Sequence, residues 1–138
     1  MEEGSINHIG IATKSLDEAG AIWSAFGFEP TNEEVLPDQG VRVRYLAGSG
    51  GTRIELLEPL DDGGPVGRFI ANKGEGVQQV AVDVEDIELA IARLKSIGLE
   101  MINEQPTIGS GGHRIAFVHP SSCGGVLIEL VEKPQSER

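Results

Sequence analysis

The sequence predicts an α+β fold of two βαβββ modules that form a curved, cup-shaped mixed sheet with the helices outside. The main observation is an internal repeat at a constant offset, which places the strand starting at His8 opposite the strand starting at Gln79. The helical pattern after each strand is repeated as well, and Ile-Glu-Leu at 54–56 recurs at 128–130. A long period that covers a strand, a helix and later strands indicates a duplicated module.

The first module begins with a strand at 7–12, where apolar and polar residues alternate. Ser15 then fits a helix N-cap, and Glu18 is placed to complete a capping box by reaching back to it. Apolar residues follow at helical spacing up to residue 26, and Gly27 is well placed to end the helix.

Two further strands are predicted in the first module, at 41–47 and 52–57, with a turn-prone glycine segment between them. Pro59 closes the second of these strands. A short helix at 66–73 is expected to link the halves. We therefore expect each half to be a strand, a helix and three more strands.

The second module repeats this order with a strand at 79–84 and a helix at 87–97. Its later strands are predicted near Met101, at 114–118 and at 126–131. The glycine-rich segment 109–112 either approaches a phosphate closely or simply connects two strands of a hairpin.

The length of 138 residues predicts a single domain that spans 1–138. We place module 1 at about 4–60, a linker at about 61–76 and module 2 at about 77–133 on the positions of the repeat.

The net charge of −11 argues against nucleic acid or an anionic membrane surface as a partner. One cysteine, Cys123, excludes an internal disulfide framework and a cysteine-rich zinc site. The sequence has no apolar run long enough to span a bilayer and no secretory signal at its start, so we expect a cytoplasmic protein.

The repeat also aligns four polar side chains in two pairs. His8 lies opposite Gln79, and Glu55 lies opposite Glu129. If facing strands of the two modules project these side chains into one cleft, they are candidate ligands of one shared metal ion.

The chain resembles the vicinal oxygen chelate superfamily, the glyoxalase and bleomycin-resistance fold, and within it the methylmalonyl-CoA epimerases. Single motifs are short, but the ordered set covers nearly the whole chain. The residues that carry the resemblance are 8–12 (HIGIA), 39–41 (QGV), 54–59 (IELLEP), 74–77 (GEGV), 108–112 (IGSGG), 117–120 (FVHP) and 124–130 (GGVLIEL).

The resemblance implies that one divalent metal ion is held by side chains from the first and last strands of each module. Residue by residue, these are His8, Glu55, Gln79 and Glu129. Gln79 stands where the epimerase pattern usually has His, and Val43 is apolar where some epimerases carry an acidic base. Because the ligand set is oxygen-rich and open, we expect cobalt, manganese or nickel rather than structural zinc.

The activity implied is metal-dependent epimerisation of (R)- and (S)-methylmalonyl-CoA, or of a related 2-substituted malonyl-CoA. Glu55 and Glu129 would be the catalytic acid and base, because equivalent strands would place them on opposite sides of the substrate. The substrate would be a small-molecule acyl-CoA, and the resemblance implies a homodimer.

Two alternatives share the scaffold. One is a glyoxalase-like, metal-dependent isomerase or lyase acting on a thiol adduct. The other is a ligand-binding protein with a degenerate metal site, which Gln79 favours. Iron-dependent ring cleavage is disfavoured because Gln79 removes the second His of the two-His, one-carboxylate triad.

Overall fold

The computed structural model describes residues 2–134, which form two compact units. One unit, the first module, spans 8–78. The other, the second module, comprises 79–134 together with 2–7. The amino-terminal residues join the second module through Asp83, whose carboxylate accepts hydrogen bonds from Ser5 and Asn7. No helix within residues 2–134 is long and apolar enough to cross a membrane.

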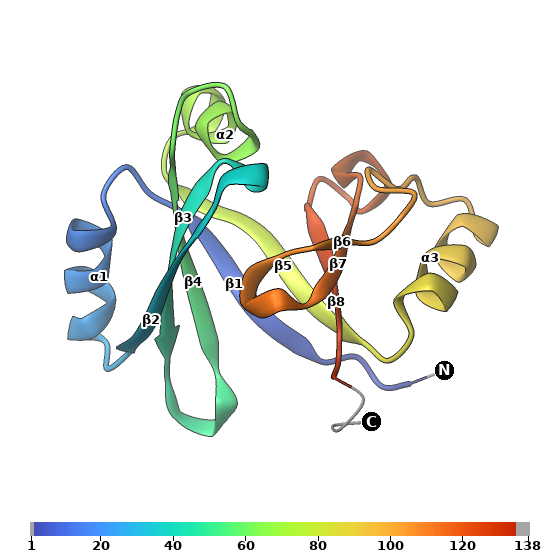
Figure 1. Cartoon of the computed structure of the whole chain (residues 1–138), viewed down its shortest axis with the longest axis horizontal. Coiled ribbons are helices and arrows are strands. Elements are labelled where there is room, and N and C mark those ends of the chain that lie inside the picture. The colour runs from blue at the N-terminus through green and yellow to red at the C-terminus, as the bar shows by residue number, and fades with distance from the viewer. Residues whose placement is uncertain (1, 135–138) are drawn as a thin grey trace. The chain divides into compact units, whose positions relative to one another are not determined.

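The first module is a four-stranded mixed sheet in the order β2-β3-β4-β1 (Figure 1). β1 and β4 are parallel, whereas β3 pairs antiparallel with β2 and β4. The elements are β1 (Ile6–Ala12), α1 (Leu16–Ala25), β2 (Glu29–Leu36), β3 (Val41–Ala47), β4 (Arg53–Pro59) and α2 (Pro65–Lys73).

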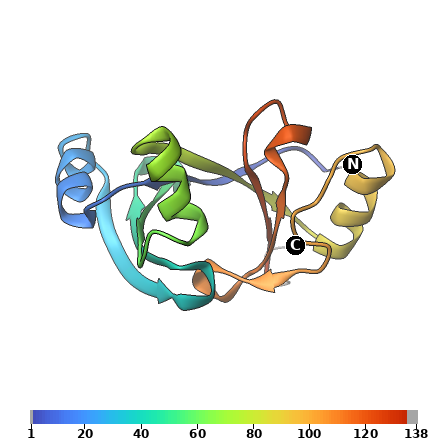
Figure 2. The same ribbon diagram turned by 90° about the horizontal axis from the view of Figure 1, so that it is seen from above.

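The two faces of this sheet are covered by different helices, as Figure 2 shows. Because side chains alternate along a strand, Ile9 and Ile11 of β1 pack toward α1, whereas Ala12 faces α2. We call these the α1 face and the α2 face. His8 is an even number of residues from Ala12 and therefore belongs to the α2 face, as does Glu55, two residues before Leu57 of the α2 cluster.

The second module repeats this plan in the order β5-β8-β7-β6. β5 and β8 are parallel, and β7 pairs antiparallel with β8 and β6. The elements are β5 (Gly76–Val84), α3 (Ile87–Ser96), β6 (Thr107–Ile108), β7 (Arg114–Val118) and β8 (Ile128–Glu132). One face packs on α3, and the other carries the cluster of Ala81, Ile115 and Val131. Gln79 and Glu129 lie on this second face by the same alternation.

The predicted α+β class and both βαβββ modules are confirmed. The two predicted module helices and the linking helix lie within about a residue of their predicted bounds. Gly27 has a φ of 93° directly after α1, a left-handed conformation that glycine adopts without strain, and it ends the helix as predicted.

Three details of the sequence prediction were incomplete or wrong. The Ser15 hydroxyl accepts the N–H of Glu18, but the Ser15 N–H donates to the Thr13 hydroxyl, so half of the capping box is absent. β2 was not located because its residues are polar and mostly exposed, as an edge strand allows. The strand near Met101 is only an isolated bridge to Val118, and the short β6 follows it.

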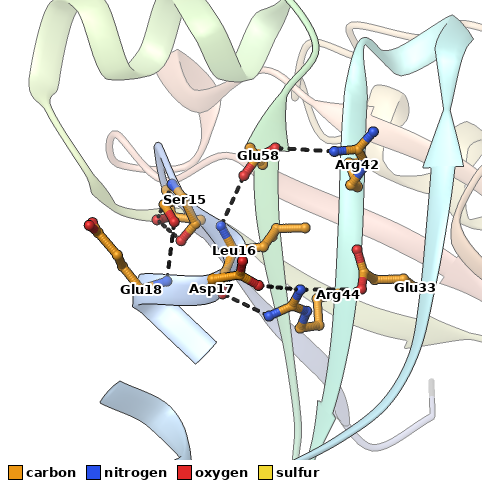
Figure 3. A network of polar contacts seen from close by, with 9 residues as sticks. Ser15, Leu16, Asp17, Glu18, Glu33, Arg42, Arg44 and Glu58 are labelled. Carbon is orange, nitrogen blue, oxygen red and sulfur yellow. Dashed lines mark hydrogen bonds and ion pairs between the residues drawn. The ribbon is translucent and has the colours of Figure 1, made fainter. Parts of the chain in front are cut away.

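A carboxylate from the last strand of each module binds the start of that module's first helix. Glu58 accepts the N–H of Leu16 in α1 at 2.9 Å (Figure 3), and Glu132 accepts the N–H of Ile87 in α3 at 2.9 Å. These N–H groups have no partner within their own helices. The repeated sequence Ile-Glu-Leu-x-Glu therefore contains a second glutamate at the same position in both modules, and the role of this glutamate is structural.

Arginines hold these two carboxylates in place. Arg42 pairs with Glu58 at 3.5 Å, and Arg114 pairs with Glu132 at 3.3 Å. The neighbouring Arg44 binds the Leu16 carbonyl, Asp17 and Glu33 on the α1 face (Figure 3), and the Asp17 carboxylate raises the pKa of Arg44 above its usual value.

Candidate metal and acid–base site

The four predicted ligands are all buried. The exposed fractions are 2% for His8, 6% for Glu55, 7% for Gln79 and 3% for Glu129. Among residues 2–134, the only other buried polar side chain is Thr13. Burying charged and amide groups is costly unless they are paired or bind a ligand. The burial therefore indicates that these four side chains are paired or bind a ligand, whereas an isolated Glu in a strand is usually solvated.

The first pair, His8 and Glu55, comes from adjacent parallel strands of the first module. In the register of β1 and β4, Gly10 lies opposite Glu55, so the even-numbered side chains of β1 share a face with Glu55. The Nδ1 atom of His8 lies 3.2 Å from Oε2 of Glu55. His8 and Glu55, which the repeat had placed in different aligned pairs, are therefore neighbours within the first module.

The second pair, Gln79 and Glu129, is built in the same way from the second module. β5 and β8 are parallel, with Ala81 opposite Glu129. The Nε2 group of Gln79 donates a hydrogen bond to Oε1 of Glu129 at 2.7 Å. A half-turn of the amide would exchange its nitrogen for its oxygen, the atom that can bind a cation.

Each pair is suited to bind a cation as two neighbouring ligands. Nitrogen and oxygen ligands lie about 2.1 Å from a divalent ion, so neighbours at right angles are about 3 Å apart. The 3.2 Å distance in the first pair matches that separation, whereas the 2.7 Å distance in the second pair is a hydrogen bond from the amide nitrogen of Gln79. Within residues 2–134, no three His, Cys, Asp or Glu side chains form a possible ligand group.

Comparisons with known proteins place this arrangement in a family. The model of the glyoxalase/bleomycin resistance protein/dioxygenase superfamily matches residues 7–117. Mitochondrial methylmalonyl-CoA epimerase of Bos taurus is 36% identical over 129 residues, which are 92% of this chain and 73% of the relative. The ethylmalonyl-CoA/methylmalonyl-CoA epimerase of Cereibacter sphaeroides is 36% identical over 92% of this chain and 96% of its own length.

Solved structures agree with the relatives. Methylmalonyl-CoA epimerase from Mycobacterium tuberculosis is 37% identical, with a TM-score of 0.89 over 96% of this chain and 89% of that one. A methylmalonyl-CoA epimerase in complex with methylmalonyl-CoA and NH4+ is also 37% identical, with a TM-score of 0.89 over 97% of both chains. This chain belongs to the methylmalonyl-CoA epimerase family. The predicted family is therefore confirmed.

Two positions depart from the epimerase pattern, and the structure describes the surroundings of both. Gln79, in place of His, binds Glu129 directly. Val43 is fully buried in the apolar cluster that includes Leu57 and Val66 of α2. The position of a possible acidic base is thus part of the core in this member of the epimerase family.

The other polar candidates have local structural roles. The Nδ1 atom of His119 accepts the N–H of Ser121 and caps a short 3₁₀ turn. The segment 109–112 closes a hairpin, because the Gly109 N–H donates to the His113 carbonyl. The same letters, Gly-Ser-Gly-Gly, close the hairpin between β3 and β4 at 48–51 with the same bond pattern. The hairpin hypothesis therefore explains this segment without a phosphate.

One polar pair on the α2 face was missed. The Tyr45 hydroxyl donates a hydrogen bond to Oε1 of Glu34 at 2.5 Å. Alternation along 41–47 already placed Tyr45 on the face of Val43, and that was the available signal. The sequence carried no signal for Glu34, because this residue lies in the edge strand β2, which the sequence pattern did not reveal.

Proposed function

We propose that this protein interconverts the (R) and (S) forms of methylmalonyl-CoA, or of a related 2-substituted malonyl-CoA. The observation that carries the proposal is that His8–Glu55 and Gln79–Glu129 are buried pairs at the equivalent positions of two repeated modules. The epimerase relatives, at 36% identity over 92% of the chain, support the same activity.

The proposed ligands of one divalent metal ion are His8, Glu55, Gln79 and Glu129. The donor set fits such an ion, because it combines one ring nitrogen with carboxylate and amide oxygens. When bound, the ion supplies positive charge that stabilises an enolate. Cobalt, manganese or nickel suits this set better than zinc, which prefers nitrogen and sulfur ligands.

The chain's own acids would move the proton. Epimerisation requires removal of the weakly acidic proton on the α-carbon and its return to the opposite face of a planar enolate. Glu55 and Glu129 are carboxylates at equivalent strand positions, and we assign one to each face as base and acid. A carboxylate that also binds a cation is a weaker base. Glu55 would therefore accept a proton less readily while it holds the metal ion.

The test is incubation of metal-reconstituted protein with one epimer of methylmalonyl-CoA in heavy water. Two-base chemistry predicts that the product epimer gains deuterium in its first turnover, while recovered substrate gains it more slowly. Metal-loaded protein that neither exchanges nor inverts the α-carbon would contradict the proposal.

A ligand-binding protein with a degenerate metal site is the second candidate, and the bond between Gln79 and Glu129 favours it. That bond already satisfies both side chains without an ion. Metal analysis of the purified protein separates the two candidates, since only the epimerase requires a bound ion. A glyoxalase-like isomerase would bind metal but would not exchange the α-proton of an acyl-CoA.

We further propose that the enzyme works in the cytoplasm as a homodimer. The support for the dimer is the family and the exposed strand β2 at the edge of the sheet, because edge strands favour association. Light scattering coupled to size-exclusion chromatography measures the mass directly, and a monomer at micromolar concentration would contradict the homodimer.

A further inference from the structure

Two side chains that the mechanism has not used lie on the α2 face of the first module. In the antiparallel registers, Glu34 of β2 lies opposite Val43 of β3, and Tyr45 of β3 lies opposite Glu55 of β4. Directly opposed residues share a face, and so do residues two apart on one strand. Glu34 and Tyr45 therefore lie on the face that also carries Glu55.

The two side chains form a fixed donor–acceptor pair. The Tyr45 hydroxyl donates to Oε1 of Glu34 at 2.5 Å, and both residues are half-buried. The Tyr45 ring packs against the apolar cluster of Val43 and Leu57, which limits its movement. Because the phenolic hydrogen points at Glu34, the lone pairs of the phenolic oxygen point elsewhere and can accept a second proton.

We propose that Tyr45 and Glu34 form a proton relay that serves the α-carbon of the substrate; this rests on the epimerase function proposed above. As the α-carbon–hydrogen bond breaks, its electron pair stays on the substrate as the enolate. The proton goes to the Tyr45 oxygen, while the original phenolic proton passes to the Glu34 carboxylate. The reverse transfer returns a proton to carbon and restores ionised Glu34, so no other reactant is needed.

The relay resolves a conflict in the role of Glu55. A carboxylate that binds a cation has its electron density drawn to that cation and is a poor base. Since Tyr45 lies opposite Glu55, the relay would serve the same side of the substrate. Glu55 can then remain a ligand throughout the reaction. In this relay Tyr45 would contact the reacting carbon, and Glu34 would act through it.

A purely structural role is the competing explanation, because the same hydrogen bond ties the edge strand β2 to β3. The variant Glu34→Gln distinguishes a proton relay from a purely structural hydrogen bond. The amide oxygen of Gln still accepts the Tyr45 hydroxyl, so the tie remains, but the amide cannot take up a proton at neutral pH. Tyr45→Phe removes the hydroxyl and keeps the packed ring. Glu33→Gln is the matched control, because Glu33 is adjacent in sequence but bonds Arg44 on the α1 face.

The experiment compares these variants with the unaltered protein, all loaded with metal, for inversion of methylmalonyl-CoA and α-deuterium uptake in heavy water. Relay function predicts that Glu34→Gln and Tyr45→Phe each lower kcat by about 10²-fold or more. KM, metal content and the thermal unfolding midpoint should stay near those of the unaltered protein in Glu34→Gln. Glu33→Gln should keep near-normal kcat.

Each result decides the question. If the unaltered protein inverts its substrate and Glu34→Gln inverts it equally fast, the relay is wrong while the epimerase function stands. If Glu34→Gln loses activity only together with metal or with folded protein, the pair is a structural tie. If metal-loaded unaltered protein neither inverts nor exchanges, the epimerase function fails and the relay fails with it.

Discussion

At the scale of single residues, the buried pairs His8–Glu55 and Gln79–Glu129 are where the sequence was most informative. The repeat identified all four positions because equivalent strands of a duplicated module face equivalent ways. The sequence could not reveal which side chains touch. The bond from Gln79 to Glu129 requires strand register, and the bond from Tyr45 to Glu34 requires an edge strand without an apolar pattern.

His8→Ala tests the metal assignment. Removal of the only nitrogen ligand in the set should reduce metal from one ion per chain to a small fraction, because oxygen ligands alone bind these ions weakly. Elemental analysis after dialysis measures the ratio, and circular dichroism confirms that the protein remains folded. His119→Ala is the control, since His119 caps a turn elsewhere. Full metal content in His8→Ala would reject the assignment.

Gln79→His approaches the same question by a gain of affinity. A ring nitrogen binds cobalt, nickel or zinc more strongly than an amide oxygen does, so affinity should rise by roughly tenfold or more if Gln79 is a ligand. Competition with a coloured chelator measures the change. Unaltered affinity would indicate that Gln79 does not bind the ion.

Glu55→Gln and Glu129→Gln test the acids of the site. Each variant keeps nearly the same shape but loses a carboxylate that is proposed to bind the metal ion or to move the proton, so each should lower the rate of epimerisation by about 10²–10⁴-fold. If one face alone is impaired and metal remains bound, α-proton exchange without inversion can survive. Near-normal epimerisation in both variants would show that neither carboxylate is needed.

Glu75 makes a contribution to stability that depends on pH. The Lys14 N–H and the Thr13 hydroxyl both donate to its carboxylate and lower its pKa from 4.5. The contribution is therefore present above the unfolded value of 4.5 and is lost as the pH falls through the folded pKa. Glu75→Gln should lower the urea midpoint at about pH 7 and lower it by less at about pH 3. An equal difference at both values would contradict this.

At the scale of elements, a carboxylate from the last strand of each module caps the start of that module's first helix. The starts of α1 and α3 were predictable from local signals, because Ser15 and Asp86 accept backbone N–H groups in the usual N-cap pattern. The bonds from Glu58 and Glu132 were not predictable, because they join helices to strands more than forty residues away.

Glu132→Ala and Glu58→Ala should each destabilise the protein by about 0.5–2 kcal/mol, the usual cost of losing a helix cap. The loss should be greater for Glu132, whose side chain is 12% exposed, than for Glu58, at 25%. Urea unfolding followed by circular dichroism measures the change. Glu18→Ala is the control, because only the Glu18 N–H takes part in the Ser15 cap. Equal stability of all variants would show that water replaces the carboxylates.

At the scale of the whole molecule, the net charge of −11 opposes the approach of an anionic acyl-CoA. Salt screens this repulsion, since the screening length falls to about 8 Å at physiological ionic strength. We expect kcat/KM to rise, by up to about tenfold, when potassium chloride is raised from low to physiological concentration. Steady-state kinetics at fixed metal concentration measures it. A fall with salt would instead reveal local basic residues that attract the substrate.

The caps also bear on the order in which the chain can fold while it is being made. Glu58 follows α1 on the chain, so the amino end of that helix gains its carboxylate only after the module's last strand has left the ribosome. For α3 the partner is Glu132, 45 residues further along the chain than Ile87. Ser5 and Asn7 are synthesised before the first module, yet they bind Asp83 in the second module. Ser5 and Asn7 can therefore form these bonds only after the whole first module has been synthesised.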